Sequence, residues 1–84
     1  MKNNDILKKK IIYRSTHRGT KEMDLLLGNF VKQHINNLNT SELYDLDRFT
    51  QIDDEVLLNL YLKKDIGDLV SENYISKMFK SFKV

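Results

Sequence analysis

The sequence predicts an all-α protein, a compact single-domain bundle of four to five short helices. Three observations indicate this fold class. Apolar residues recur at intervals of three and four along almost the whole chain, no useful stretch alternates with a period of two, and the 84 residues include no proline. A chain of this length fits one domain, residues 1–84, in which we expect residues 1–5 to be frayed. Helices this short are not stable alone, so their apolar faces must pack against one another.

The first two predicted helices are separated by a turn that contains Gly19. The first helix covers about residues 4–15, where isoleucines and a leucine stand between lysines. Thr20 is a suitable N-cap for the second helix, which carries the widest apolar stripe in the chain. This stripe consists of Met23, Leu26, Leu27, Phe30, Val31, His34, Ile35 and Leu38. We interpret His34 as a histidine at the edge of the core rather than a metal ligand.

Three shorter helices are predicted in the second half of the chain. Asn39 and Glu42 have the spacing of a capping box, which predicts a third helix through Leu43, Leu46 and Phe49. The acidic residues 53–55 start a fourth helix, where negative charge favours the positive end of the helix dipole. After a turn at Gly67, a fifth helix is expected over about residues 69–82. Its predicted apolar stripe is Val70, Tyr74, Ile75, Met78 and Phe82.

Composition excludes several kinds of site. The chain has no cysteine, so disulfides and thiolate metal sites are absent, and its two histidines, His17 and His34, cannot make a zinc site unaided. We therefore predict no metal site. The apolar runs are far shorter than the roughly 20 residues of a membrane span, so membrane insertion is not expected. The N-terminal residues lack the apolar region of a secretory signal, which favours a cytoplasmic location.

Charge is distributed unevenly along the chain. Residues 1–21 hold seven Lys and Arg against one Asp, whereas residues 22–84 hold seven against eleven Asp and Glu. This asymmetry indicates either a basic face for an acidic partner or an ordinary solvated helix surface. One alternative function is therefore a small helical nucleic-acid-binding or regulatory module that uses the basic N-terminus. Residues 65–79 weakly resemble a helix-turn-helix, but they offer few side chains that could read bases.

No catalytic constellation is visible. Neither histidine lies in a nucleophile–base motif, and no phosphate-binding glycine loop is present. Chemistry-bearing side chains instead gather at the turn between the first two helices, where a glycine permits close approach of the backbone. These residues are Arg14, His17, Arg18, Gly19, Glu22 and Asp24. They could form a docking surface for a partner, or an intramolecular cap and salt bridge at a tight turn.

The turn carries the motif R-G-x-x-E as Arg18-Gly19-Thr20-Lys21-Glu22, extended by Met23-Asp24. With this motif the chain resembles the FAD assembly factors of succinate dehydrogenase, a family with bacterial and mitochondrial members. A second point of similarity is Asp54-Glu55-Val56-Leu57, which matches a D-x-D-L segment of the family. This segment departs from the family pattern at Val56, and at Leu60, where a tryptophan is usual. The resemblance extends over about residues 11–80.

The resemblance implies a binding protein and not an enzyme. Family members dock on the flavoprotein subunit of succinate dehydrogenase and promote attachment of FAD to a histidine of that subunit. FAD would thus belong to the partner, and fumarate reductase would be a possible further client. The resemblance also implies a location in the bacterial cytoplasm. Apart from the resemblance, we take a monomer as the default state and expect no binding of nucleic acid. Carried over to this chain, the partner-binding residues are Arg18, Gly19 and Glu22, flanked by Arg14, His17 and Asp24.

Overall fold

Five α-helices and one short 3-10 helix make up the computed structural model, which describes residues 3–83. The elements are α1 (Asn3–Thr16), α2 (Lys21–His34), η1 (Ile35–Asn37), α3 (Thr40–Phe49), α4 (Asp54–Tyr61) and α5 (Tyr74–Ser81). No strand occurs within residues 3–83, so the prediction of an all-α bundle is confirmed. Of the segment expected to be frayed, residues 3–5 belong to α1, whereas residues 1 and 2 lie outside the described residues.

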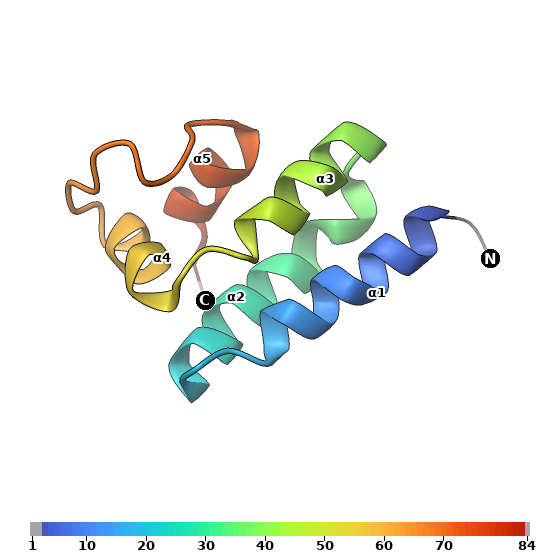
Figure 1. The fold of residues 1–84 in the computed structure, drawn as a ribbon, viewed down its shortest axis with the longest axis horizontal. Helices are drawn as coiled ribbons and strands as arrows, with labels where there is room; N and C mark the ends of the chain where they lie inside the picture. Colours follow the sequence, from blue (N-terminus) through green and yellow to red (C-terminus); the bar gives the residue numbers. More distant parts are fainter. Residues whose placement is uncertain (1–2, 84) are drawn as a thin grey trace.

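Helices α1 and α2 form an antiparallel pair along one side of the molecule, and α3 runs beside them in contact with α1 (Figure 1). A Cβ on Gly28 would lie 3.2 Å from Cγ2 of Thr16 and 3.6 Å from the carbonyl oxygen of Ser15. The missing side chain of Gly28 therefore lets α2 approach the end of α1 closely. Ile11 of α1 is fully buried, which ties the first helix into the core.

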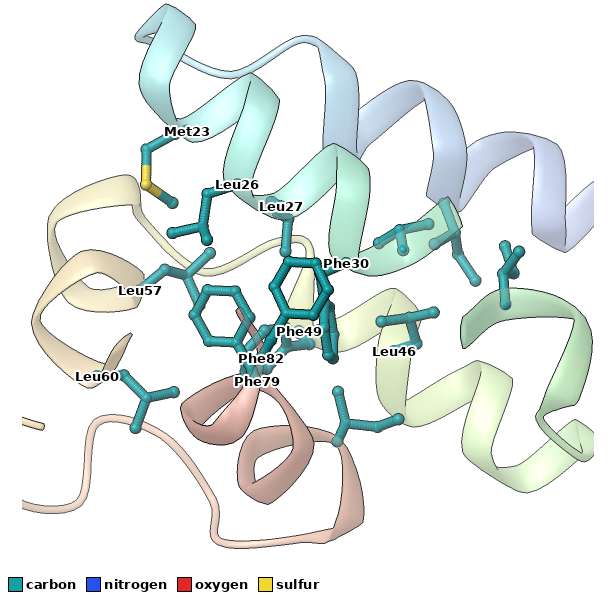
Figure 2. Packing of buried hydrophobic residues seen from close by; sticks show 14 of the residues in the cluster. Met23, Leu26, Leu27, Phe30, Leu46, Phe49, Leu57, Leu60, Phe79 and Phe82 are labelled. Carbon is teal, nitrogen blue, oxygen red and sulfur yellow. The ribbon is translucent and has the colours of Figure 1, made fainter. Parts of the chain in front are cut away.

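An aromatic cluster lies where α2, α3 and α5 meet (Figure 2). The ring of Phe79 is 5.1 Å from that of Phe30 and 5.1 Å from that of Phe49, both in edge-to-face geometry. Phe82 packs on Phe30 at 5.4 Å, and Tyr61 of α4 donates a hydrogen bond to the carbonyl oxygen of Phe82. These contacts hold the two C-terminal helices against the α1–α3 layer. Each such aromatic pair adds about 0.5–1.5 kcal/mol beyond area burial.

The predicted caps of α2 and α3 are confirmed. The hydroxyl of Thr20 accepts a hydrogen bond from the amide of Met23. Asn39 and Glu42 form the expected reciprocal capping box, with hydrogen bonds of 2.8 and 2.9 Å. His34 lies at the edge of the aromatic cluster, its ring 5.0 Å from that of Phe30, as predicted. Local sequence chemistry thus fixes both helix starts.

The predicted fifth helix was too long, because α5 begins at Tyr74 and not near residue 69. Asn73 and Ser76 form a second capping box that fixes this start. Residues 62–73 form an irregular connection in which Lys63 and Gly67 both have a φ of 60°. The predicted apolar stripe of α5 was also wrong in two positions. Phe79, which it omitted, is fully buried, whereas Tyr74, which it included, is 55% exposed.

Substitution of Phe79 and Tyr74 tests this revised register of α5. Phe79→Ala should lower the free energy of unfolding by about 3–5 kcal/mol, because it leaves a cavity in the aromatic cluster. Tyr74→Ala should change it by less than about 0.5 kcal/mol, since that ring is largely in solvent. Urea unfolding followed by circular dichroism measures both. Equal destabilisation by the two variants would contradict the observed register.

Candidate functional site

The side chain of Arg18 joins the α1–α2 turn to the connection between α3 and α4. Its guanidinium donates hydrogen bonds to the carbonyl oxygens of Thr50 and Ile52. Its Nε donates to Oδ1 of Asp54 at 2.7 Å. Only 10% of the Arg18 side chain is exposed, so these contacts are largely shielded from water. A planar guanidinium presents five donors on three nitrogen atoms and can reach three acceptors spread around it, whereas a lysine has three donors on a single nitrogen.

Helix ends supply the acceptors for this arginine. Thr50 is the C-cap of α3, where backbone carbonyls lack partners within the helix and favour a cation. Asp54 is the first residue of α4, where the positive end of the helix dipole favours a carboxylate. The Arg18–Asp54 pair therefore complements both helices at the point where the chain turns from one to the other.

Gly19 lies against the same carboxylate. Its amide donates a hydrogen bond of 2.9 Å to Oδ2 of Asp54, so each oxygen of this carboxylate accepts from one residue of the motif. A Cβ on Gly19 would lie 3.1 Å from Oδ2, closer than most such contacts. Among residues 3–83 the only positive φ values belong to Lys63 and Gly67, so Gly19 is required here for close approach and not for backbone conformation.

The backbone of the turn is held by two further residues. The amide of Arg18 donates a hydrogen bond to Oδ1 of Asp24, one turn into α2. Thr20 caps the same helix through its hydroxyl. Hydrogen bonds between residues of the extended motif therefore hold its backbone in place. Asp24, predicted as a flanking partner contact, has an intramolecular bond that orients the turn.

The other predicted site residues differ in side-chain exposure and in their contacts within the chain. Arg14 pairs with Asp47 of α3, although 39% of its side chain remains exposed. His17 is exposed, stacks on the ring of Tyr13, and contacts the carbonyl oxygen of Tyr13 through Nδ1. Glu22 is exposed and, within residues 3–83, makes no hydrogen bond or ion pair. The structure thus turns Arg18 inward and leaves Glu22 in solvent.

Sequence reasoning missed the role of Asp54, which it assigned only to the electrostatics of a helix start. The signal that could have found it is the match of Asp54 to the first acidic position of the D-x-D-L segment. Arg18 and Asp54 belong to two motifs of the same family and carry opposite charges, so they are natural candidates for an ion pair. Asp54 is 36 positions from Arg18 and 35 from Gly19 in sequence, and folding alone brings it against them.

No group of three or more His, Cys, Asp or Glu side chains within residues 3–83 could hold a metal ion. One open cleft, of about 630 Å³, lies beside the α4–α5 connection, and it is lined by none of the predicted site residues. Among the helices of the described chain, none has the length and apolar composition needed to cross a membrane.

A family model described as flavinator of succinate dehydrogenase matches residues 9–83. The chain belongs to this family. The match includes the motif turn, the α3–α4 connection and Asp54, which are the parts that the arginine network joins. The resemblance inferred from R-G-x-x-E is confirmed at the level of the family.

Curated relatives agree with this assignment. Succinate dehydrogenase assembly factor 2, mitochondrial, from Dictyostelium discoideum is 43% identical over 58 residues, which are 69% of this chain and 41% of that protein. The FAD assembly factor SdhE of Acetobacter pasteurianus is 32% identical over 50 residues, 60% of this chain and 46% of that protein. The chain therefore spans less than half the length of the curated relatives it matches. No solved structure shows significant similarity to the chain.

The alternative of a nucleic-acid-binding module in this flavinator family member finds no support in the structure. Residues 65–73, which would supply the first helix and turn of a helix-turn-helix, are not helical. Five residues of α5 lie outside its buried face, and the cations among them are Lys77 and Lys80. Base recognition by a helix needs several polar side chains directed into a groove.

Two of the three arginine–aspartate pairs among the described residues, Arg18–Asp54 and Arg48–Asp45, provide a test of the network in this family member. Arg18→Lys should lower the free energy of unfolding by about 2 kcal/mol, because a lysine keeps the charge but leaves backbone carbonyls without donors. Arg48→Lys is the control, since the Arg48–Asp45 pair is exposed and should contribute less than about 0.5 kcal/mol. Urea unfolding of both variants measures the difference. A similar small loss in both would show that the Arg18 network does not stabilise the fold.

Proposed function

We propose that this chain is an assembly factor that binds the flavoprotein subunit of succinate dehydrogenase and promotes covalent attachment of FAD to it. The observation that carries this proposal is the family match over residues 9–83. The geometry adds that the motif turn is held by hydrogen bonds to Asp54 and that Glu22 lies in solvent beside it. An exposed carboxylate without an intramolecular partner is available to a cation on a partner protein.

In this proposal the factor contributes position and not a catalytic group. Docking stabilises the conformation of the partner subunit in which its histidine and the flavin are aligned. Alignment of two reacting groups can lower the activation free energy considerably, even when the helper protein contributes no acid, base or nucleophile. In this proposal FAD belongs to the partner subunit, as the family resemblance implies.

The remaining parts of the proposal concern context. We propose that the factor acts as a monomer, with the flavoprotein of fumarate reductase as a second client. We propose the bacterial cytoplasm as its location, a reducing compartment consistent with a chain that has no cysteine.

Within the motif we assign different roles to residues that face in different directions. Glu22, together with His17 on the adjacent turn, meets the partner directly. Arg18 and Gly19 act through the shape of the turn, because the arginine side chain and the glycine amide are both bound to Asp54. Asp24 fixes the same turn from inside α2. Arg14 lies at the edge, held by Asp47 and still partly exposed.

Glu22 and Glu55 form a matched pair for testing the docking role. Each is an exposed glutamate at the second position of its helix, so each contributes about 0.3–1 kcal/mol to folding through the helix dipole. Glu22→Ala should reduce flavinylation of the partner subunit and weaken its binding by about 2–5 kcal/mol. Glu55→Ala should leave both unchanged. Flavinylation that follows only the folded fraction of each variant would contradict the docking role of Glu22.

A second experiment tests whether the factor itself reacts with flavin. The purified chain incubated with FAD alone should form no covalent adduct, because no nucleophile–base pair is available on it. Addition of the flavoprotein subunit should place the flavin on that subunit only. Intact-mass spectrometry distinguishes the two proteins. A covalent flavin adduct on the factor would contradict the proposal that only the flavoprotein subunit reacts with FAD.

A further inference from the structure

Helix α1 has a second row of side chains that faces solvent. Ile6, Lys10, Tyr13 and His17 follow one another at intervals of four, three and four, and all are exposed. Ile6 is 45% and Tyr13 is 63% exposed, whereas the opposite face of the helix packs on the core through Ile11. A surface helix needs only one apolar face to pack on a domain. The outer row is therefore not explained by folding.

The aromatic member of this row is held in place. The rings of Tyr13 and His17 are stacked, with centroids 3.9 Å apart and an angle of 15° between their planes. Nδ1 of His17 lies 2.8 Å from the carbonyl oxygen of Tyr13, which fixes the imidazole on the helix. An exposed tyrosine that is already ordered loses little side-chain entropy when a partner covers it. Tyrosines in such positions often contribute much of the binding energy of an interface.

Charge indicates what kind of partner fits this row. Residues 1–21 carry a large excess of positive charge, and Lys10 stands in the row between the two apolar members. Arg14 adds less to this surface charge, because it is neutralised by its ion pair with Asp47. A tyrosine with a lysine beside it complements an apolar depression bordered by carboxylates. The partner surface is therefore acidic.

Position connects the row with the motif turn. The row ends at His17, the residue directly before Arg18, and the turn itself is fixed by the contacts of Arg18 and Gly19 with Asp54. One rigid body thus presents both the outer face of α1 and Glu22.

We propose that the outer face of α1, formed by Ile6, Lys10, Tyr13 and His17, is a second docking surface for the flavoprotein subunit. It receives an acidic, partly apolar patch of that subunit, while Glu22 contacts a cation elsewhere on it. This inference rests on the proposed function, and it adds a contact region outside the R-G-x-x-E motif. Two separate contact regions fix the orientation of the factor on its partner, which a single turn of five residues does not.

The test measures binding of the purified flavoprotein subunit to three variants by isothermal titration calorimetry. Tyr13→Ala should raise the Kd by about ten- to thirtyfold. Lys10→Glu should raise it as well, and should weaken the dependence of the Kd on salt concentration. Tyr44→Ala is the matched control, because this tyrosine is 51% exposed on α3 and lies outside the row. Its Kd should equal that of the wild-type chain.

The outcomes separate this inference from the proposed function. If the wild-type chain binds and Glu22→Ala weakens binding, but Tyr13→Ala and Lys10→Glu do not, the second surface is refuted and the function stands. If the wild-type chain does not bind the subunit, both fail together. Vesicles of anionic phospholipid and a duplex DNA serve as further probes. Binding to either that is lost in Tyr13→Ala, with subunit binding unchanged, would assign the face to that partner and overturn the inference.

Discussion

The hydrogen bonds of Arg18 are the interaction on which the arrangement of this protein depends. One guanidinium binds the end of α3, the connection that follows it and the first residue of α4. The α1–α2 turn is thereby attached to the place where the chain enters its C-terminal half. Removing such a partly buried cation would leave a carboxylate and two carbonyl oxygens without their donor, a costly state inside a protein. The fold and the motif turn therefore depend on the same side chain.

This dependence gives the family motif a physical interpretation. Arg18 and Gly19 form the inward half of R-G-x-x-E, because both donate to Asp54. Glu22 forms the outward half, since it lies exposed on the first turn of α2. A substitution in the inward half changes the shape of the turn, and one in the outward half changes only its surface. Loss of function alone cannot distinguish the two, so folding stability must be measured alongside it.

The C-terminal half is held by aromatic packing and by few local constraints. Residues 62–73 connect α4 to α5 without regular structure, and only their apolar side chains Ile66 and Val70 pack against the core. The position of α5 is set by Phe79 and Phe82 against Phe30, together with the hydrogen bond from Tyr61. Contacts distant in sequence thus place this helix against the core, while its start, like those of α2 and α3, is fixed by a local cap.

The sequence by itself determined the helical class, the starts of α2 and α3, and membership of the flavinator family. These follow from local rules: apolar periodicity, a side-chain oxygen at an N-cap, and a short motif. The tertiary structure decided where α5 begins, because Leu69 and Val70 fit a helical pattern equally well until the Asn73–Ser76 box and the burial of Phe79 are known.

It also decided which motif residues are bound within the fold and which are left in solvent. Burial and hydrogen bonding of Arg18 depend on Asp54, 36 residues away, and no spacing rule reports a contact over that distance. The sequence could state that an arginine, a glycine and a glutamate stand together, but only the fold turned the arginine inward and left the glutamate in solvent. The physical reason is that periodicity and caps act within one helix, whereas an ion pair between helices exists only after they have packed.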